Sequence, residues 1–209
     1  MNPEEDKIRL RSALELRQHV EGLVEIRDYL RDAGIPYFVG GGTLLGIVRD
    51  GSLIPWDWDL EVDFRAENLY PLAGRVLADL RRAGFSVLRY DSSMLNLKLK
   101  LEKSGAIYEL LGWQRLGSFR YRRSYRLPAR VFERASSVRI DGNDFSTFGD
   151  PETYLRYQYG DWTTPIRTSD KSVYLTRECS TPPSISVATA LRVSEVGHKF
   201  RLGLLRLRA

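Results

Sequence analysis

The stretch at residues 40–64, GGGTLLGIVRDGSLIPWDWDLEVDF, joins three consecutive glycines to a segment in which acidic and apolar residues alternate. A β-strand points successive side chains to opposite faces, so a period of two places all the acids on one face. We therefore predict a strand at residues 54–64 with one acidic face and one buried apolar face. The acids are Asp57, Asp59, Glu61 and Asp63, and the apolar residues are Trp56, Trp58, Leu60, Val62 and Phe64.

The acidic face predicts a metal site. Neighbours on one face of a strand lie about 7 Å apart, and several like charges at this spacing repel one another and raise the carboxylate pKa values. A bound divalent cation relieves this conflict, and Mg²⁺ is commonly held by one or two carboxylates with waters and substrate phosphates. We expect Asp57 and Asp59 to bind Mg²⁺ or Mn²⁺, and Asp63 to lie behind them or in solvent. The alternative is a solvated face whose acids pair with nearby Arg and Lys.

The glycines follow the apolar run at residues 37–39, which suits a short buried strand. Backbone without side chains can approach a phosphate closely and donate its N–H groups to phosphate oxygens. Gly41, Gly42 and the hydroxyl of Thr43 therefore form a candidate phosphate site. A tight structural turn is the other interpretation, and the lack of a following Gly-Lys-Ser/Thr excludes a Walker A loop.

A glycine-pair turn followed by an acid-x-acid strand is the arrangement of the nucleotidyltransferase superfamily, and the string GGTLLGIVRDGSLIPWDWDLEV resembles the LicD/fukutin family in particular. The family pattern falls on residues 41–46, Arg49 and residues 54–61. Glu61 stands where the family usually has Asp, so its carboxylate is displaced relative to the family's ligand. The resemblance implies that Glu61 joins the metal ligands and that Arg49 grips a phosphate, with a salt bridge from Arg49 to Asp57 or Asp63 as the alternative.

Later segments add three more candidates. The superfamily completes its site with a carboxylate from a later strand, and Glu109 is the only acid in the apolar run 106–111. A lone acid there needs a metal, an Arg partner or a general-base role, because an uncompensated buried charge is costly. Lys98 or Lys100, in the alternating run 95–101, is expected to contact nucleotide phosphates unless both are solvated. Asp161 lies in a Tyr-Gly-Asp segment that resembles the end of the family's core.

The expected fold is an α/β or α+β nucleotidyltransferase-like domain, with a small mixed sheet flanked by helices. We assign it residues 1–178 and treat residues 179–209 as a basic C-terminal tail, helical in part. Helices are predicted at 6–33, 43–48, 69–83 and 150–159. Strands are predicted at 85–90, 95–101 and 106–111, with a less regular strand-rich zone at 119–140.

Composition limits the partners and the compartment. Thirty-two Lys and Arg against 27 Asp and Glu give a net charge of +5, which suits anionic partners without indicating specific nucleic-acid binding. Arginines interleaved with aromatic residues at 119–139 either hold a nucleotide or polyanion or form a solvated rim.

The single cysteine, Cys179, excludes an intramolecular disulfide. A charged N-terminus and the lack of a long apolar run predict a cytoplasmic protein, and the basic, partly apolar tail leaves peripheral membrane contact open.

The resemblance implies transfer of a phospho-substituted alcohol, such as phosphocholine or ribitol phosphate, from a CDP-linked donor to a hydroxyl of a glycan, with release of CMP. In charge terms, a divalent cation would neutralise the diphosphate and a carboxylate would deprotonate the acceptor hydroxyl. Two alternatives stay open. One is a nucleotidyltransferase that attaches NMP to a small molecule, protein or RNA and releases pyrophosphate. The other is a non-catalytic basic protein that binds nucleic acid or an anionic membrane surface.

Overall fold

The computed structural model describes residues 8–93, 96–182 and 189. The strands in this part of the chain are β1 (Phe38–Val39), β2 (Asp59–Arg65), β3 (Ser86–Ser93), β4 (Asn96–Lys103), β5 (Ala106–Leu116), β6 (Phe119–Arg122), β7 (Tyr125–Pro128), β8 (Ala135–Ile140) and β9 (Asn143–Phe148). The helices are α2 (Ala13–Asp32), α3 (Gly41–Asp50), α4 (Ala66–Leu69), α5 (Ala73–Arg82), α6 (Pro151–Tyr159) and α7 (Lys171–Tyr174), with short 3-10 turns η1 (Tyr70–Leu72) and η2 (Ala129–Phe132).

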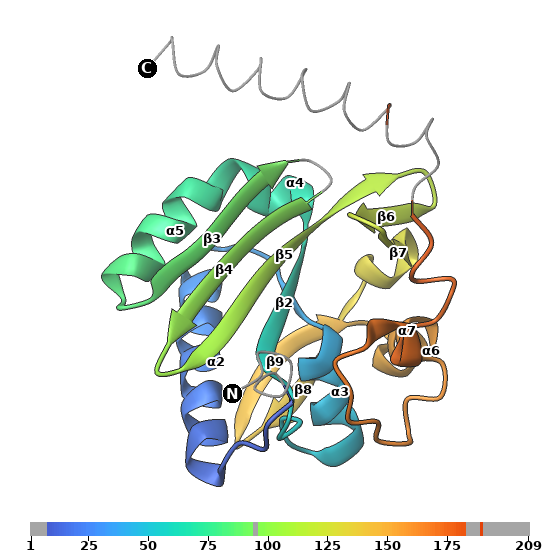
Figure 1. Ribbon diagram of the computed structural model, residues 1–209. Coiled ribbons are helices and arrows are strands. Elements are labelled where there is room, and N and C mark those ends of the chain that lie inside the picture. The colour runs from blue at the N-terminus through green and yellow to red at the C-terminus, as the bar shows by residue number, and fades with distance from the viewer. Residues whose placement is uncertain (1–7, 94–95, 183–188, 190–209) are drawn as a thin grey trace.

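Within these residues the strands form one nine-stranded mixed sheet whose main path runs β3-β4-β5-β2-β1-β9-β8, and β6 and β7 extend from the end of β5 as a hairpin. The central strand β2 runs parallel to β5 and antiparallel to β1. Helices α2 and α5 lie behind β3, β4 and β5, while α3, α6 and α7 gather beside the start of β2 (Figure 1). The predicted mixed sheet flanked by helices is confirmed.

Local sequence explains where the main helices begin and end. Ser12 and Glu15 form a reciprocal capping box at the start of α2, and Gly34, with a positive φ of 66°, follows its end. Of the span 6–33, in which one or two helices are predicted, residues 8–12 are not helical, and residues 6 and 7 lie outside the described residues. The helix predicted at 69–83 is split into η1 and α5 by Pro71, which lies in the 3-10 turn. Those predicted at 43–48 and 150–159 are confirmed as α3 and α6.

The strand predicted at residues 54–64 is right in its second half and wrong in its first. Leu60, Val62 and Phe64 of β2 are buried in the core, as the alternation requires. Residues 54–58, however, turn back, and the N–H of Asp57 donates to the carbonyl of Ile54 at 3.0 Å. Pro55 has no N–H for a strand ladder, which favours this turn. Consequently the side chains of Trp56 and Trp58 are half-buried beside a cavity and do not join the apolar face.

The compact body continues beyond the predicted boundary at residue 178. Cys179 is buried in the core, and its carbonyl accepts a hydrogen bond of 2.9 Å from the N–H of Arg126. Apart from residue 189, residues 183–209 of the predicted basic tail lie outside the described residues, as does residue 95 of the predicted strand 95–101. Within the part of the chain that the structure describes, no helix combines the length and the apolar character needed to cross a bilayer.

Candidate active site

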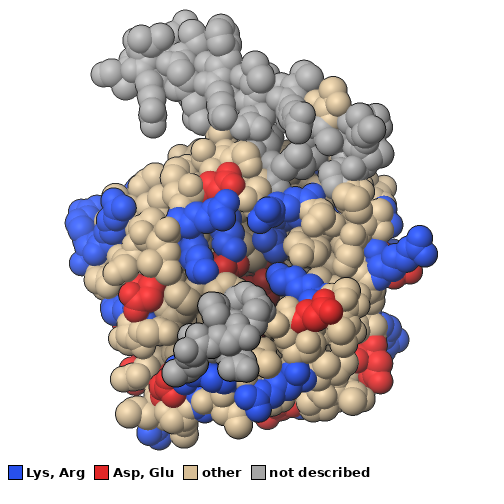
Figure 2. Space-filling model, in the orientation of Figure 1, with Lys and Arg blue, Asp and Glu red and all other residues tan. Residues whose placement is uncertain are grey.

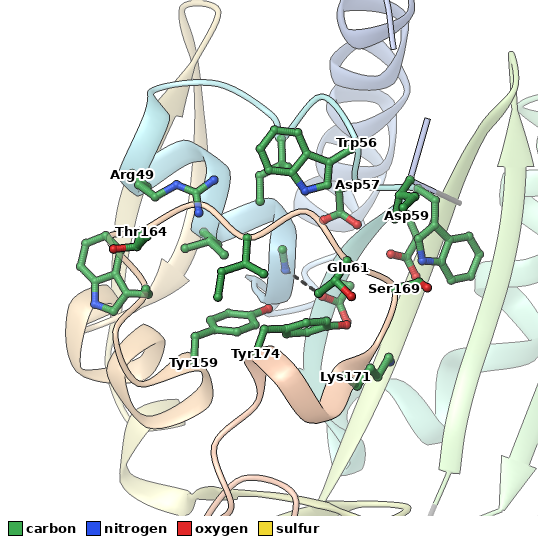
Figure 3. Close-up of a pocket in the computed structure, with 18 of the residues that line it drawn as sticks. Arg49, Trp56, Asp57, Asp59, Glu61, Tyr159, Thr164, Ser169, Lys171 and Tyr174 are labelled. Carbon is green, nitrogen blue, oxygen red and sulfur yellow. Dashed lines mark hydrogen bonds between the residues drawn. The ribbon is translucent and has the colours of Figure 1, made fainter. Parts of the chain in front are cut away.

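A cavity of about 200 Å³ opens beside the start of β2, between the turn at 54–58, the first turn of α3 and the segment at 159–174. Asp57, Asp59 and Glu61 line it together. Figure 3 shows the three carboxylates facing the same space. The structure therefore brings together three of the acids that the sequence analysis names as candidate metal ligands.

These acids repel one another, as the pattern predicts. Burial raises the pKa of Asp57 to about 7, and the charge of Glu61 adds to the rise. Burial also raises the pKa of Asp59 well above its ordinary value, with further contributions from Asp57, Glu61 and Glu109. The raised pKa values of Asp57 and Asp59 mean that their charged forms are disfavoured, which is the condition that a bound cation relieves.

The glycines before β2 make room for these carboxylates. Gly41 has a φ of 54°, and a Cβ at this position would collide with the Glu61 carboxylate. A Cβ at Gly42 would likewise collide with the Asp57 carboxylate. Only glycine allows the first turn of α3 to approach the acids this closely.

In the structure, the turn at Gly41, Gly42 and Thr43, which is the expected phosphate site, makes hydrogen bonds to the protein itself. The N–H of Gly42 donates to Glu61 Oε2 at 2.9 Å, and that of Gly41 donates to the Tyr154 hydroxyl at 2.8 Å. Thr43 Oγ1 accepts a hydrogen bond of 2.8 Å from the N–H of Glu61. The anion held by the glycine turn is thus the protein's own Glu61, which favours the structural-turn interpretation, and contact of this turn with a phosphate stays a prediction.

The basic residues predicted to contact phosphates are already paired with acids. Arg49 lines the cavity, but its guanidinium pairs with Asp50 at 2.7 Å and with neither Asp57 nor Asp63. Lys98 Nζ lies 2.5 Å from Glu109 Oε1. These ion pairs reduce the charge that Arg49 and Lys98 can offer to a ligand.

Glu109 is buried on β5 directly opposite Glu61 of β2. Its charge raises the pKa of Asp59, but Glu109 does not line the cavity of about 200 Å³. Lys98 is its partner, with Lys100 4.0 Å away and also 4.3 Å above the Trp58 ring. The predicted metal or base role of Glu109 therefore stays a prediction, in competition with an ion pair.

Asp63 and Asp161 have structural partners. Asp63 is buried, not solvated, and its Oδ1 accepts a hydrogen bond of 2.7 Å from Trp113 Nε1. Burial raises the pKa of Asp63 to about 7, and Glu61 contributes to the rise. Asp161 lines the cavity wall and accepts hydrogen bonds from the hydroxyl and N–H of Thr163, which lower its pKa. Asp161 thus orders the turn that forms this wall.

Apart from Asp161, the residues of the far wall of the cavity were not predicted. It comes from the segment at 159–174, whose aromatic, hydroxyl and ammonium groups face the acids (Figure 3). This segment has no periodic pattern, and only the local run Thr-Ser-Asp-Lys-Ser at 168–172 hints at a polar surface. Its lining residues are Tyr159, Asp161, Trp162, Thr164, Ile166, Thr168, Ser169, Lys171 and Tyr174.

A second, smaller cavity of about 50 Å³ lies behind the first. The two share Glu61, Tyr159, Lys171 and Tyr174 as lining residues. Arg122 lines only the second cavity. Glu61 and Lys171 therefore stand at the junction of two adjoining spaces.

The donor set fits a hard divalent cation. Among the described residues no group of three or more His, Cys, Asp or Glu side chains could by itself hold a metal ion. Mg²⁺, however, commonly takes only one or two carboxylates and completes its shell with waters and substrate phosphates. Asp57 and Asp59, both facing an open cavity, suit this incomplete type of site.

The mixed sheet, with an acidic strand beside a glycine turn, defines a nucleotidyltransferase-like fold. The solution structure of the antibiotic-resistance factor ANT(2'')-Ia resembles it with a TM-score of 0.50 and 15% sequence identity, over 92% of this chain and 97% of that one. Residues 34–98 match the family described as LicD/FKTN/FKRP, nucleotidyltransferase domain. The resemblance to the LicD/fukutin family is confirmed over the segment that carries α3 and β2.

Individual relatives match over limited lengths. Two relatives are the ribitol 5-phosphate transferases FKRP of Mus musculus and of Homo sapiens. Each is 37% identical to this chain over 60 residues, which make up 29% of this chain and 11% of the relative. The protein T07A5.1 of Caenorhabditis elegans is 26% identical over 162 residues, or 69% of this chain and 42% of that one. The chain thus matches only a small part of the two ribitol 5-phosphate transferases.

Proposed function

We propose that the chain is a metal-dependent phosphotransferase that moves a phospho-substituted alcohol from a CDP-linked donor to a hydroxyl of a glycan or a similar acceptor. The observation that carries this proposal is the cluster of Asp57, Asp59 and Glu61 at an open cavity, in the segment that matches the LicD/FKTN/FKRP family. The names of the FKRP relatives support a phosphorylated polyol as the transferred group.

Each residue of the cluster has a role in this proposal. Asp57 and Asp59 hold Mg²⁺ or Mn²⁺, which when bound neutralises the donor diphosphate and the leaving nucleotide. The Gly42 N–H fixes one oxygen of Glu61, and Glu61 lines both cavities. These contacts support the role of Glu61 as the base that takes the proton of an acceptor hydroxyl. The half-buried rings of Trp56 and Trp162 offer flat surfaces to the base of the donor.

The products of the reaction test the proposal. The protein is incubated with CDP-ribitol or CDP-choline, a glycan acceptor and Mg²⁺, and the released nucleotide is identified. CMP release with labelled acceptor supports phosphotransfer. Pyrophosphate release from CTP or ATP would instead establish nucleotidyl transfer, and polyanion binding with neither product would establish the binding-protein alternative.

The double variant Asp57→Asn, Asp59→Asn tests the metal site. We expect the variant to fold and to lose activity. Mg²⁺ is expected to raise the melting temperature of the wild type, because a ligand that binds only the folded state stabilises it, and to leave that of the variant unchanged. Full activity in the variant would exclude these two residues as essential ligands.

A further inference from the structure

The charges around the cavity are unevenly distributed. The carboxylates of Asp57, Asp59 and Glu61 lie on one wall, and Lys171 lies on the opposite wall (Figure 3). Figure 2 shows the same contrast from outside, with Lys and Arg side chains gathered around a hollow in which carboxylates appear. A ligand that carries both a metal cation and phosphates would match the two walls.

Lys171 and Arg122 are basic residues near the cluster that form no ion pair with the described acids. Arg122 Nε is also buried without a hydrogen-bond partner among the described residues. Arg122 lies near Asp63 and opposes the rise in its pKa, but the Asp63 carboxylate already accepts a hydrogen bond from Trp113. The two basic side chains therefore keep charge that a ligand can use, unlike Arg49 and Lys98.

Both basic side chains lie over the same aromatic ring. Lys171 Nζ and Arg122 Cζ are each 5.6 Å from the centre of the Tyr125 ring, and Arg122 is also 5.2 Å from that of Trp113. The rings attract both cations, so two positive side chains line the second cavity. A bound anion would complement these positive charges, in the way that a cation would complement the acids.

The position of Lys171 fits contact with a phosphate. Lys171 lines both cavities and shares their junction with Glu61. Its charge also reaches Asp59, whose raised pKa it partly opposes. The hydroxyl residues Thr164 and Thr168 lie on the same wall. A phosphate bound to a cation at Asp57 and Asp59 would therefore meet an ammonium group on its other side.

We infer that Lys171, with Arg122 behind it, grips the phosphates of the nucleotide donor, so that this positive half of the site comes from residues beyond the matched segment 34–98. The inference rests on the proposed function, since it takes a nucleotide diphosphate as the ligand. It assigns to Lys171 and Arg122 the contact that the sequence suggests for Arg49 and Lys98. An ammonium or guanidinium group donates charge-assisted hydrogen bonds to phosphate oxygens, and Arg can do so in bidentate fashion.

The test is calorimetric titration of the full chain with CDP and with inorganic pyrophosphate, each with Mg²⁺. We expect Lys171→Met to weaken binding of both probes by about 10- to 100-fold, the usual cost of a charge-assisted hydrogen bond. Lys171→Arg should recover most of the affinity, and Arg122→Met should show a smaller loss. Arg177→Met is the matched control, because Arg177 is exposed on the same segment and lines neither cavity. Its affinity should equal that of the wild type.

The outcomes separate this inference from the proposed function. Wild-type affinity in Lys171→Met overturns the inference and leaves the function intact. In another outcome, the wild type binds pyrophosphate but not CDP, and Lys171→Met loses the pyrophosphate binding. That result supports the inference about Lys171 and overturns the proposal that the donor carries cytidine. If the wild type binds neither probe, both are wrong. The salt dependence of CDP binding is also compared between Lys171→Met and the wild type. It should be weaker in the variant if Lys171 contacts a phosphate, and the same in both proteins if Lys171 has only a structural role.

Discussion

Three consecutive glycines pack directly against three carboxylates, two in β2 and one in the turn before it. A Cβ at Gly40, Gly41 or Gly42 would meet the carboxylate of Asp63, Glu61 or Asp57, respectively. Two constraints coincide at this point, because the carboxylates need a close backbone and the turn needs a residue that accepts a positive φ at position 41. The glycine turn therefore acts on the chemistry indirectly, by holding the acids in place.

The substitution Gly41→Ala tests this packing. Alanine would be strained at a φ of 54° and would displace Glu61. We expect the free energy of unfolding in urea to fall by about 2 kcal/mol and transferase activity to fall with it. Gly74→Ala in α5 is the control, since nothing lies within 4 Å of a Cβ there. It should be neutral or stabilising by about 0.5 kcal/mol, and an equal loss in both variants would refute the packing argument.

His19 makes stability depend on pH. Its side chain is buried in α2, and burial, with a contribution from Arg11, lowers its pKa from 6.5 to about 4. Between these values the unfolded chain binds a proton that the folded protein does not. The contribution of His19 to the free energy of unfolding is therefore complete above pH 6.5 and decreases as the pH falls toward 4, by about 3 kcal/mol at most.

Urea unfolding of the wild type and of His19→Gln at about pH 7.5 and about pH 4.5 measures this contribution. The wild type should lose about 2 kcal/mol more than the variant between the two pH values. The comparison cancels the opposite effect of Asp57 and Asp63, whose raised pKa values act in both proteins. Equal losses in wild type and variant would show that His19 is accessible to protons in the folded state.

At the scale of elements, periodic segments were predictable and turns were not. The buried apolar residues of β2 and β4 follow the period of two, and α3 and α6 have clear sequence signals at their ends. The alternation in residues 54–58 has the same period but forms a turn. Pattern alone cannot distinguish side chains that alternate along a strand from side chains that line a cavity, and here Trp56 and Trp58 do the latter.

The candidate site was predictable on the side of its acids and not on the side of its cations. Asp57, Asp59 and Glu61 are close in sequence and share a strand motif, so local sequence reveals them. The pairing of Arg49 with Asp50 and of Lys98 with Glu109 depends on side-chain conformations and on the register of β4 with β5. The contribution of Lys171 depends on how the segment after α6 folds back over β2, which no local pattern indicates.

At the scale of the whole molecule, the segment after α6 belongs to the body of the fold. It carries Lys171 and Tyr174 to the cavity and ends with Cys179 in the core. The carbonyl of Cys179 pairs with β7 through the N–H of Arg126. Removing this segment would expose buried apolar surface and leave backbone groups without partners, both of which are costly.

Two truncated chains test where the folded body ends. A chain that ends at residue 182 should keep the urea midpoint and the CDP affinity of the full chain, because it retains Cys179 and its contacts. A chain that ends at residue 170 should unfold at lower urea concentration and lose CDP binding, since it lacks Lys171 and the core contacts of Cys179. A marked loss of stability in the longer variant would place residues beyond 182 in the folded body. Unchanged stability in the shorter one would instead place the end of that body before α7.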